Sequence, residues 1–240
     1  MSLLRVEALS KNFAGLRAVS DVSFAVAEGS ITALIGPNGA GKTTCFNLIA
    51  GALAPSAGRV LFAGDDVTGE PPEALCMRGI GRTFQIVRPM PDLTVLENAM
   101  VGAFAREARL VAAEAAAADA LARVGLLPKA SMLASQLTLP DRKMLEVARA
   151  LATRPRLLLL DEVMAGLRPG EAGAIVATLR AANEAGVTIL MIEHVMRVVM
   201  ALARHIGVLH HGEQIADGSP EEVTRDPAVI RSYLGERGVA

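Results

Sequence analysis

One glycine-rich segment carries residue types whose spacing suits phosphate chemistry. Residues 36–43 read GPNGAGKT, which matches the pattern G-x-x-x-x-G-K-S/T, with a strand-like apolar run before it and a helix-like run after it. Glycines let the backbone curl so that successive N–H groups point at phosphate oxygens, and a helix start adds its positive end. Lys42 would reach the β- and γ-phosphates as a point charge. The residues expected to hold a nucleoside triphosphate are Gly36, Pro37, Asn38, Gly39, Ala40, Gly41, Lys42, Thr43 and Thr44.

Hydroxyl and carboxylate groups predict a magnesium site that serves this loop. Thr43 would offer its hydroxyl to Mg²⁺. Asp161 and Glu162 follow the apolar run RLLLL, so they would emerge at the carboxyl end of a strand, where open α/β sheets bind ligands. There Asp161 can hold Mg²⁺, and Glu162 can orient or deprotonate the attacking water. Alone, such a pair is an ordinary acidic strand end, but the phosphate loop favours the catalytic interpretation.

The elements that must position these groups follow from the hydrophobic pattern. The run SITALIG is almost continuously apolar, as expected for a strand whose sheet is covered on both faces. Beyond Arg156, strand-like and helix-like runs alternate, ending with one expected strand at residues 205–218. Residues 89–151 are instead rich in strong helix formers. We therefore predict an α/β fold with a parallel-sheet core, an N-terminal antiparallel β part and an inserted helical subdomain.

Length and composition place these elements in one domain. The prediction is a single domain over residues 1–240, with a core of residues 1–88 and 152–240 and a helical subdomain of residues 89–151. The formal net charge of −1 offers no basic face for nucleic acid, and the two cysteines are expected to be reduced thiols. No secretory signal and no apolar run of about 18 residues is evident, so we expect a soluble chain that can still dock on a membrane-embedded partner.

Beyond these motifs, the sequence resembles the ATP-binding subunits of ABC transporters almost from end to end. GRTFQ resembles that family's Q-loop, with Gln85 as its glutamine, and MIEHVM resembles its switch-histidine segment, with His194. KNFAGLRAVSDVSF places Phe13 where the family stacks an aromatic ring on adenine, and AGLRP resembles the D-loop. The resemblance implies a P-loop NTPase fold of the RecA-like type that uses ATP and Mg²⁺.

The same resemblance implies roles for the matched residues. Gln85 would ligate Mg²⁺ through its side-chain oxygen, and His194 would donate to a γ-phosphate oxygen as charge develops. Together with Glu162, these residues would form the catalytic set. Each has a plainer alternative: Gln85 and His194 could be ordinary polar surface residues, and Phe13 could be a core residue.

The family's signature segment, usually L-S-G-G-Q, is altered in this chain. The matching residues are Thr138, Leu139, Pro140 and Asp141. Pro140 has no N–H, so one backbone donor to the partner's γ-phosphate is missing, and Leu139 adds bulk there. Because the chain's own catalytic residues are intact, we hypothesise a heterodimer of unequal subunits, in which the ATP covered by this segment is hydrolysed slowly.

Longer stretches resemble the ATP-binding subunits of branched-chain amino-acid importers, a group that also handles related amides and urea. They include residues 81–103 and the ending IADGSPEEVTRDPAVIRSYLGE. The resemblance implies transmembrane permease subunits, a second and different ATP-binding subunit, and indirectly a substrate-binding protein. It also implies a cytoplasmic position on the inner face of the cell membrane, and the isolated chain could form a homodimer.

Other functions stay open from the sequence. The chain could be a soluble ATPase of the same superfamily, although it has neither a long coiled-coil insertion nor two fused ATPase halves. A P-loop kinase fits less well with the adjacent Asp161–Glu162 pair. A nucleotide-binding subunit with little hydrolysis is favoured only by Pro140. The transported substrate cannot be deduced from residues that never touch it.

Overall fold

The computed structural model describes residues 2–83, 89–168 and 170–234. Their contacts divide the chain into two compact units, Met1–Pro72 with Thr188–Ala240, and Glu73–Val187. Each unit holds part of the chemistry that the sequence predicts, and each is described by itself.

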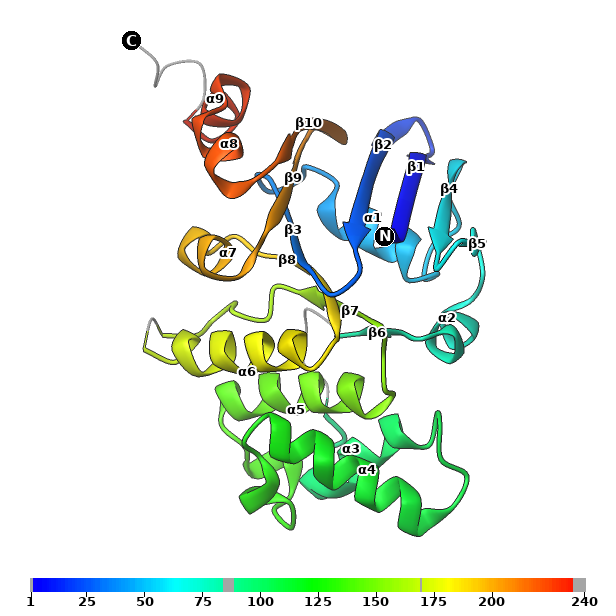
Figure 1. The fold of residues 1–240 in the computed structure, drawn as a ribbon, viewed down its shortest axis with the longest axis vertical. Coiled ribbons are helices and arrows are strands. Elements are labelled where there is room, and N and C mark those ends of the chain that lie inside the picture. The colour runs from blue at the N-terminus through cyan, green and yellow to red at the C-terminus, as the bar shows by residue number, and fades with distance from the viewer. Residues whose placement is uncertain (1, 84–88, 169, 235–240) are drawn as a thin grey trace. The chain divides into compact units, whose positions relative to one another are not determined.

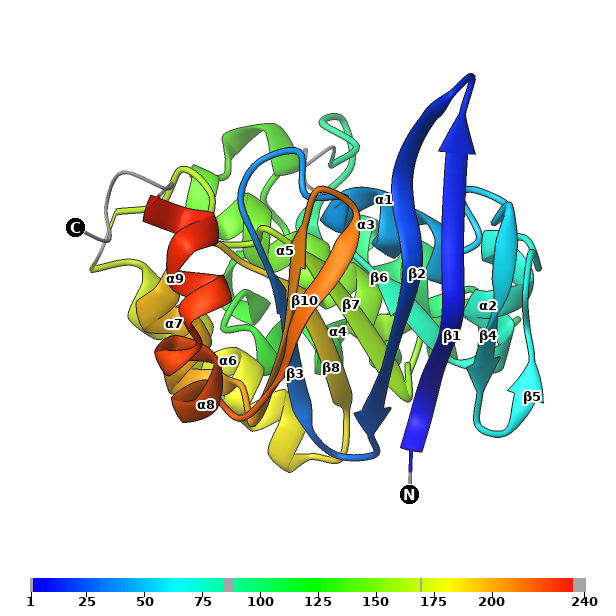
Figure 2. The same ribbon diagram turned by 90° about the horizontal axis from the view of Figure 1, so that it is seen from above.

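The first unit contains an antiparallel sheet at its N-terminal end, as predicted. Strand order in this sheet is β2-β1-β4-β5, and every pairing is antiparallel. Figure 2 shows β1 and β2 as a long pair that runs the length of the sheet. Alternate residues of β2 are buried, which matches one face packed on a core. The strands are β1 (Ser2–Phe13), β2 (Leu16–Ala27), β4 (Ala57–Phe62) and β5 (Asp65–Asp66).

A second sheet of the first unit carries the phosphate loop. Its strands lie in the order β10-β9-β3-β8, with β3 parallel to both β8 and β9. Every residue of β3 and β8 is buried. Figure 1 shows α1 on one side of these strands and α7, α8 and α9 on the other, which explains their continuous apolar runs. The elements are β3 (Ile31–Ile35), α1 (Lys42–Ile49), β8 (Thr188–Ile192), α7 (Met196–Leu202), β9 (His205–His210), β10 (Glu213–Gly218), α8 (Pro220–Arg225) and α9 (Pro227–Leu234).

The single strand expected at residues 205–218 is wrong, because the chain turns back there as a hairpin. Strands β9 and β10 pair antiparallel around the turn residues His211 and Gly212. Both turn residues have positive φ, 49° and 84°, as tight two-residue hairpin turns of the primed type require. The Gly212 N–H donates to the Ala40 carbonyl at 3.0 Å, and the Ser20 N–H donates to the Gly212 carbonyl at 2.8 Å. The turn is therefore bonded to the phosphate loop.

The second unit combines a parallel strand pair with helices. Strand β7 is fully buried and pairs parallel with β6. Helices α3, α4 and α5 pack against one another, in the stretch where the sequence predicts helices. Helix α2 was not expected from the sequence pattern. The elements are α2 (Pro72–Arg78), β6 (Ile80–Arg82), α3 (Val95–Ala103), α4 (Leu110–Arg123), the short 3₁₀ helices Leu127–Lys129 and Ala134–Gln136, α5 (Leu139–Ala152), β7 (Leu157–Asp161) and α6 (Ala172–Glu184).

Side chains at the helix ends fix these helices in place. A capping box starts α3, because Thr94 and Glu97 each accept a hydrogen bond from the other's backbone N–H. Arg106 donates to the carbonyls of Cys76, Met77 and Thr153 at 2.8–3.0 Å. Since those carbonyls belong to the last turn of α2 and the end of α5, one guanidinium bonds the carboxyl ends of two helices.

Within the described parts of the chain, no helix is both long enough and apolar enough to cross a membrane.

Candidate nucleotide-binding and hydrolysis site

The phosphate loop lies between the end of β3 and the start of α1, as the sequence predicts. Gly36, Gly39 and Gly41 all have positive φ, at 148°, 80° and 96°. A Cβ on Gly36 would lie 2.1 Å from the Leu209 carbonyl oxygen, and one on Gly41 would lie 2.5 Å from the Ala18 carbonyl oxygen. These two glycines are therefore required both by backbone angle and by space. Within the loop, Asn38 is exposed and Pro37 is half-buried.

The charges around the loop suit a polyanion. Lys42 is buried, and its ammonium donates to the carbonyls of Gly36 and Pro37 at 2.7 and 2.9 Å. The first turn of α1 contains no acidic residue, so its positive end is not neutralised there. Thr43 is exposed and Thr44 is half-buried, which leaves the Thr43 hydroxyl accessible to a ligand. The loop thus combines a held cation, the positive end of a helix and an accessible hydroxyl, which is the chemistry that a triphosphate needs.

Phe13 ends β1 with 41% of its surface exposed, so it is not a core residue. The Lys11 ammonium lies 5.2 Å from the ring centroid and also donates to the Ala54 carbonyl at 2.6 Å. This cation–π contact supports the ring while a large part of it stays accessible. The arrangement is compatible with stacking on adenine, which stays a prediction.

His194 is the second residue after the end of β8, and it is exposed. Because Leu34 of β3 lies opposite Ile192 of β8 in parallel register, both strands end at the same edge of the sheet. His194 and the first residues of the phosphate loop therefore follow neighbouring strand ends. Sequence analysis missed Glu193, which is only 2% exposed at this edge. A charged residue directly after an apolar strand is the signal that could have indicated it.

Asp161 is the last residue of β7 and is only 1% exposed. Its backbone N–H donates to the Thr83 hydroxyl oxygen at 3.3 Å, and its carboxylate lies 3.6 Å from the Arg82 guanidinium. Burial lowers the pKa of Arg82, while the Asp161 carboxylate opposes that shift. Arg82 is a second residue that sequence analysis missed. It lies inside the quoted motif GRTFQ, and a cation within an apolar strand could have indicated its role.

Glu162 has an unusual backbone conformation. Its φ of 48° lies in the left-handed region, where residues other than glycine are uncommon. Its carbonyl accepts a bond from the Ala165 N–H at 3.1 Å and one from the Lys143 ammonium at 3.4 Å. Such backbone strain persists only where neighbouring groups hold it, and it clusters at functional sites. The geometry supports Glu162 as the candidate base and adds Lys143 as a residue that holds it.

The altered signature segment forms a well-capped helix start. Thr138 caps α5, and its hydroxyl donates to the Asp141 carboxylate at 2.7 Å. The Lys129 ammonium donates to the same carboxylate at 2.6 Å. Burial alone would raise the pKa of Asp141, but the hydrogen bonds from Lys129 and Thr138 outweigh it and lower that pKa. Leu139 is exposed, and its Cδ2 would lie 3.3 Å from a Cβ placed on Gly166 of the expected D-loop.

The predicted site residues are thus shared between the two units. The first unit holds the phosphate loop, Phe13 and His194, and the second holds Asp161, Glu162 and the signature segment. Gln85 lies outside the described residues.

The chemistry of two predicted residues, each taken by itself, suits a magnesium ion that arrives with a nucleotide. In the described ranges, no group of three or more His, Cys, Asp or Glu side chains could hold a metal by itself. Asp161 in the second unit carries a carboxylate and Thr43 in the first carries a hydroxyl, and both are oxygen groups of the kind that Mg²⁺ prefers. This ion is usually held by one or two protein carboxylates together with substrate phosphates.

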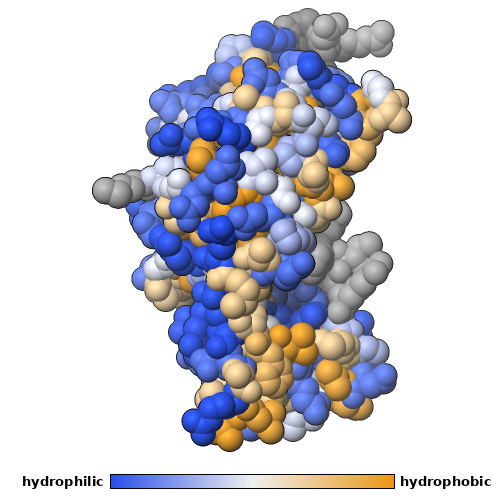
Figure 3. All heavy atoms as spheres, turned by 90° about the vertical axis from the view of Figure 1, so that its right-hand side faces the viewer, coloured by the Kyte–Doolittle hydropathy of each residue, from blue (hydrophilic) through white to orange (hydrophobic). Residues whose placement is uncertain are grey.

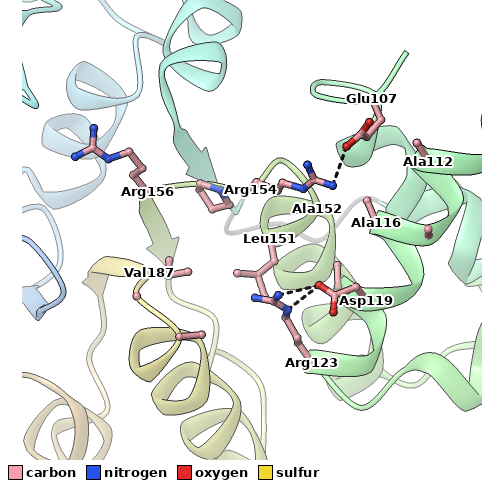
Figure 4. Close-up of a pocket in the computed structure, with 15 residues that line it drawn as sticks. Glu107, Ala112, Ala116, Asp119, Arg123, Leu151, Ala152, Arg154, Arg156 and Val187 are labelled. Carbon is pink, nitrogen blue, oxygen red and sulfur yellow. Dashed lines mark hydrogen bonds and ion pairs between the residues drawn. The ribbon is translucent and has the colours of Figure 1, made fainter. Parts of the chain in front are cut away.

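A cavity of about 640 Å³ lies wholly within the second unit, and it is separate from the predicted site residues. Figure 4 shows that it opens between α4 and the segment that joins α5 to β7. Arg154 pairs with Glu107 at 2.8 Å, and Arg123 pairs with Asp119 at 2.9 Å. Since both carboxylates already have cationic partners, we assign the cavity no ligand.

Comparisons with known proteins agree with this geometry. Residues 19–165 match the family model described as ABC transporter, and residues 213–239 match the one described as branched-chain amino acid ATP-binding cassette transporter.

Named relatives span the whole chain. The high-affinity branched-chain amino acid transport ATP-binding protein BraF of Pseudomonas aeruginosa is 39% identical over 254 residues, covering 98% of each chain. The corresponding protein LivG of Escherichia coli is 40% identical over 253 residues, with the same coverage.

Solved structures show the same fold. A nucleotide-free ATP-binding cassette from an ABC transporter aligns with a TM-score of 0.90 and 33% identity, over 98% of this chain and 100% of that one. An ADP-bound conformation of such a cassette aligns with a TM-score of 0.89, 34% identity and the same coverage. The predicted P-loop NTPase fold is therefore confirmed, and the chain belongs to the ABC transporter ATP-binding family, in its branched-chain amino acid group.

Proposed function

We propose that this chain hydrolyses ATP to energise the import of branched-chain amino acids, or of related small solutes, through a membrane permease. One observation carries the proposal. A phosphate loop in which Gly36 and Gly41 cannot carry a Cβ without a clash lies in a chain that aligns over 98% of its length with branched-chain amino acid transport ATP-binding proteins. A soluble ATPase of the same superfamily is disfavoured, because the named relatives are transport proteins.

Each residue has a defined task in the proposed reaction. Lys42 and the amides of the phosphate loop bind the triphosphate, and Phe13 stacks on the base. Mg²⁺, held by Asp161, Thr43 and Gln85, would neutralise charge on the phosphates. Glu162 orients the attacking water and accepts its proton, and His194 donates to a γ-phosphate oxygen as negative charge builds there. Positioning and electrostatic stabilisation supply most of the rate enhancement in phosphoryl transfer.

The second unit offers a surface for the permease subunits. Five exposed apolar side chains lie on α2, on α3 and near the start of α4, namely Met77, Val101, Phe104, Leu110 and Val111. Figure 3 views the side that carries these elements and shows apolar atoms gathered there. Apolar groups exposed together on a surface are typical of protein interaction sites. Together with the relatives, which are transport ATP-binding proteins, this surface supports a position on the inner face of the cell membrane.

The signature segment supports unequal subunits. Pro140 removes a backbone donor, and the Asp141 carboxylate is already bonded to Lys129 and Thr138. This segment is thus a poor cover for a partner's triphosphate. We propose a second, different ATP-binding subunit beside this chain, and a substrate-binding protein that delivers the solute from outside.

Reconstitution tests the proposal directly. The full chain is assembled with its permease subunits, its companion ATP-binding subunit and the substrate-binding protein in liposomes, and ATP-dependent uptake of labelled leucine is measured. Uptake is expected with this chain and not with its Lys42→Ala variant, which loses the cation of the phosphate loop. ATP hydrolysis that is indifferent to the permease and to leucine would contradict an importer.

A further inference from the structure

Arg82 lies in the GRTFQ motif but has been given no task so far, yet it faces the predicted metal ligand Asp161. Its Nη2 atom lies 3.6 Å from Oδ2 of Asp161, and the two side chains are only 14% and 1% exposed. Charges this close and this far from water interact strongly, because little solvent screens them. The negative charge of Asp161 therefore has a resident cation within the protein.

The backbone holds the two charges face to face. Arg82 lies opposite Leu159 in the parallel β6–β7 pair. The Thr83 N–H donates to the Leu159 carbonyl at 2.9 Å, and the Asp161 N–H donates to the Thr83 hydroxyl oxygen at 3.3 Å. The guanidinium is thus presented by a paired strand and not by a mobile surface segment.

We propose that Arg82 is a positioning residue that acts as the resident counter-ion of Asp161 and competes with the divalent cation that accompanies the nucleotide. A cation cannot approach Asp161 without repulsion from the guanidinium, or without weakening the ion pair. Nucleotide phosphates add negative charge and shift that balance toward the metal. Arg82 therefore makes metal binding depend on the nucleotide. This inference rests on the proposed nucleotide site, but not on the transported solute.

The second unit contains a matched pair for comparison. Arg123 and Asp119 also form an arginine–aspartate ion pair, at 2.9 Å, but their side chains are 49% and 62% exposed. Neither residue belongs to the nucleotide site. Replacing Arg123 changes the chain's charge by the same amount as replacing Arg82, but in an ion pair that does not contain Asp161.

The test measures Mn²⁺ affinity by electron paramagnetic resonance on the isolated full-length chain saturated with ADP. Arg82→Gln is expected to bind Mn²⁺ about tenfold more tightly than the wild type, because a nearby cation is removed. Arg82→Lys, which keeps the charge, and Arg123→Gln are expected to match the wild type. Thermal melting and ADP affinity without metal confirm that each variant is folded.

Unchanged or weaker Mn²⁺ binding by Arg82→Gln overturns the inference, since Arg82 would then only stabilise the fold or orient Asp161. Arg82→Met provides a second neutral variant if the glutamine variant does not fold. A lysine variant that binds Mn²⁺ tenfold more tightly overturns the inference as well. Failure of leucine uptake in the reconstituted system would leave these results untouched, so the two proposals fail separately.

Discussion

At the scale of single residues, the two acidic groups of the site differ in how they are held. Asp161 is buried and paired with Arg82, whereas Glu162 is half-buried and left-handed, with its carbonyl bonded to Lys143. The contact with Arg82 balances the charge of the Asp161 carboxylate, whereas the bond from Lys143 fixes the backbone of Glu162. Substitutions of the supporting residues should therefore separate binding from turnover.

Lys143→Met is expected to lower the kcat of ATP hydrolysis by about tenfold while leaving the KM for ATP nearly unchanged, because it releases the Glu162 backbone and not the nucleotide. Steady-state hydrolysis in the assembled transporter checks this. Lys129→Met is the matched control, since its ammonium bonds Asp141 and not Glu162. A rise in KM with an unchanged kcat would contradict the role assigned to Lys143.

Phe13→Ala is expected to weaken ATP binding several-fold, because aromatic stacking contributes about 0.5–1.5 kcal/mol beyond buried area. Phe13→Tyr keeps the ring and should bind like the wild type. Fluorescent-nucleotide titration of the isolated chain measures both variants. Equal affinity of the alanine variant and the wild type would show that Phe13 does not contact the base.

At the scale of elements, strand ends and helix starts carry most of the site. The phosphate loop follows β3, His194 follows β8, Asp161 ends β7, and Thr138 caps α5. Each of these positions offers side chains or backbone groups that the regular element leaves open. The start of α5 is the clearest place to test how such a cap contributes to stability.

Asp141→Asn is expected to lower the melting temperature at pH 7, because it replaces the carboxylate that Lys129 and Thr138 bond. The pKa of Asp141 is lowered in the folded chain relative to its ordinary value of 3.8. The ionised group therefore stabilises the fold above that value, and this stabilisation is lost as the pH falls through the folded pKa.

The difference in melting temperature between the wild type and the Asp141→Asn variant should accordingly shrink as the pH is lowered below 3.8, and calorimetry at several pH values measures it. Asp119→Asn, in an exposed ion pair, is the control and should show a smaller difference at pH 7. A difference that grows toward low pH would contradict the argument.

At the scale of the whole molecule, the sequence was sufficient for the fold class and for the order of the motifs. Local sequence patterns were enough to predict β3, α1 and β7, because apolar runs and glycine spacing involve only residues that are close together in the sequence. Contacts between side chains that are far apart in the sequence could not be predicted from such patterns. Arg82 with Asp161 and Lys143 with Glu162 depend on which strands and helices become neighbours. The β9–β10 hairpin was missed because its turn, His211–Gly212, is only two residues long and does not begin with the Asn, Asp or Gly that usually marks such a turn.

The proposed pairing of two different ATP-binding subunits predicts that the same substitution lowers ATP hydrolysis by different amounts in each subunit. Glu162→Gln in this chain alone should remove most ATP hydrolysis by the assembled transporter, because in the proposed heterodimer the companion's signature segment covers this chain's own triphosphate. The equivalent change in the companion subunit should remove much less. Phosphate release by the purified complex measures both. Activity near the wild-type level for Glu162→Gln would refute the division of labour.

The hairpin turn at Gly212 contacts two segments that lie far from it in the sequence. The Gly212 N–H donates to the Ala40 carbonyl, and a Cβ on Gly212 would lie 2.9 Å from the Ala18 carbonyl oxygen. A genetic screen for defective nucleotide retention should thus recover changes at Gly212, which lies more than 160 positions downstream of the residues it braces. Selection for glycine at position 212 would come from its close packing against Ala40 and Ala18, because Gly212 itself does not have to contact the nucleotide.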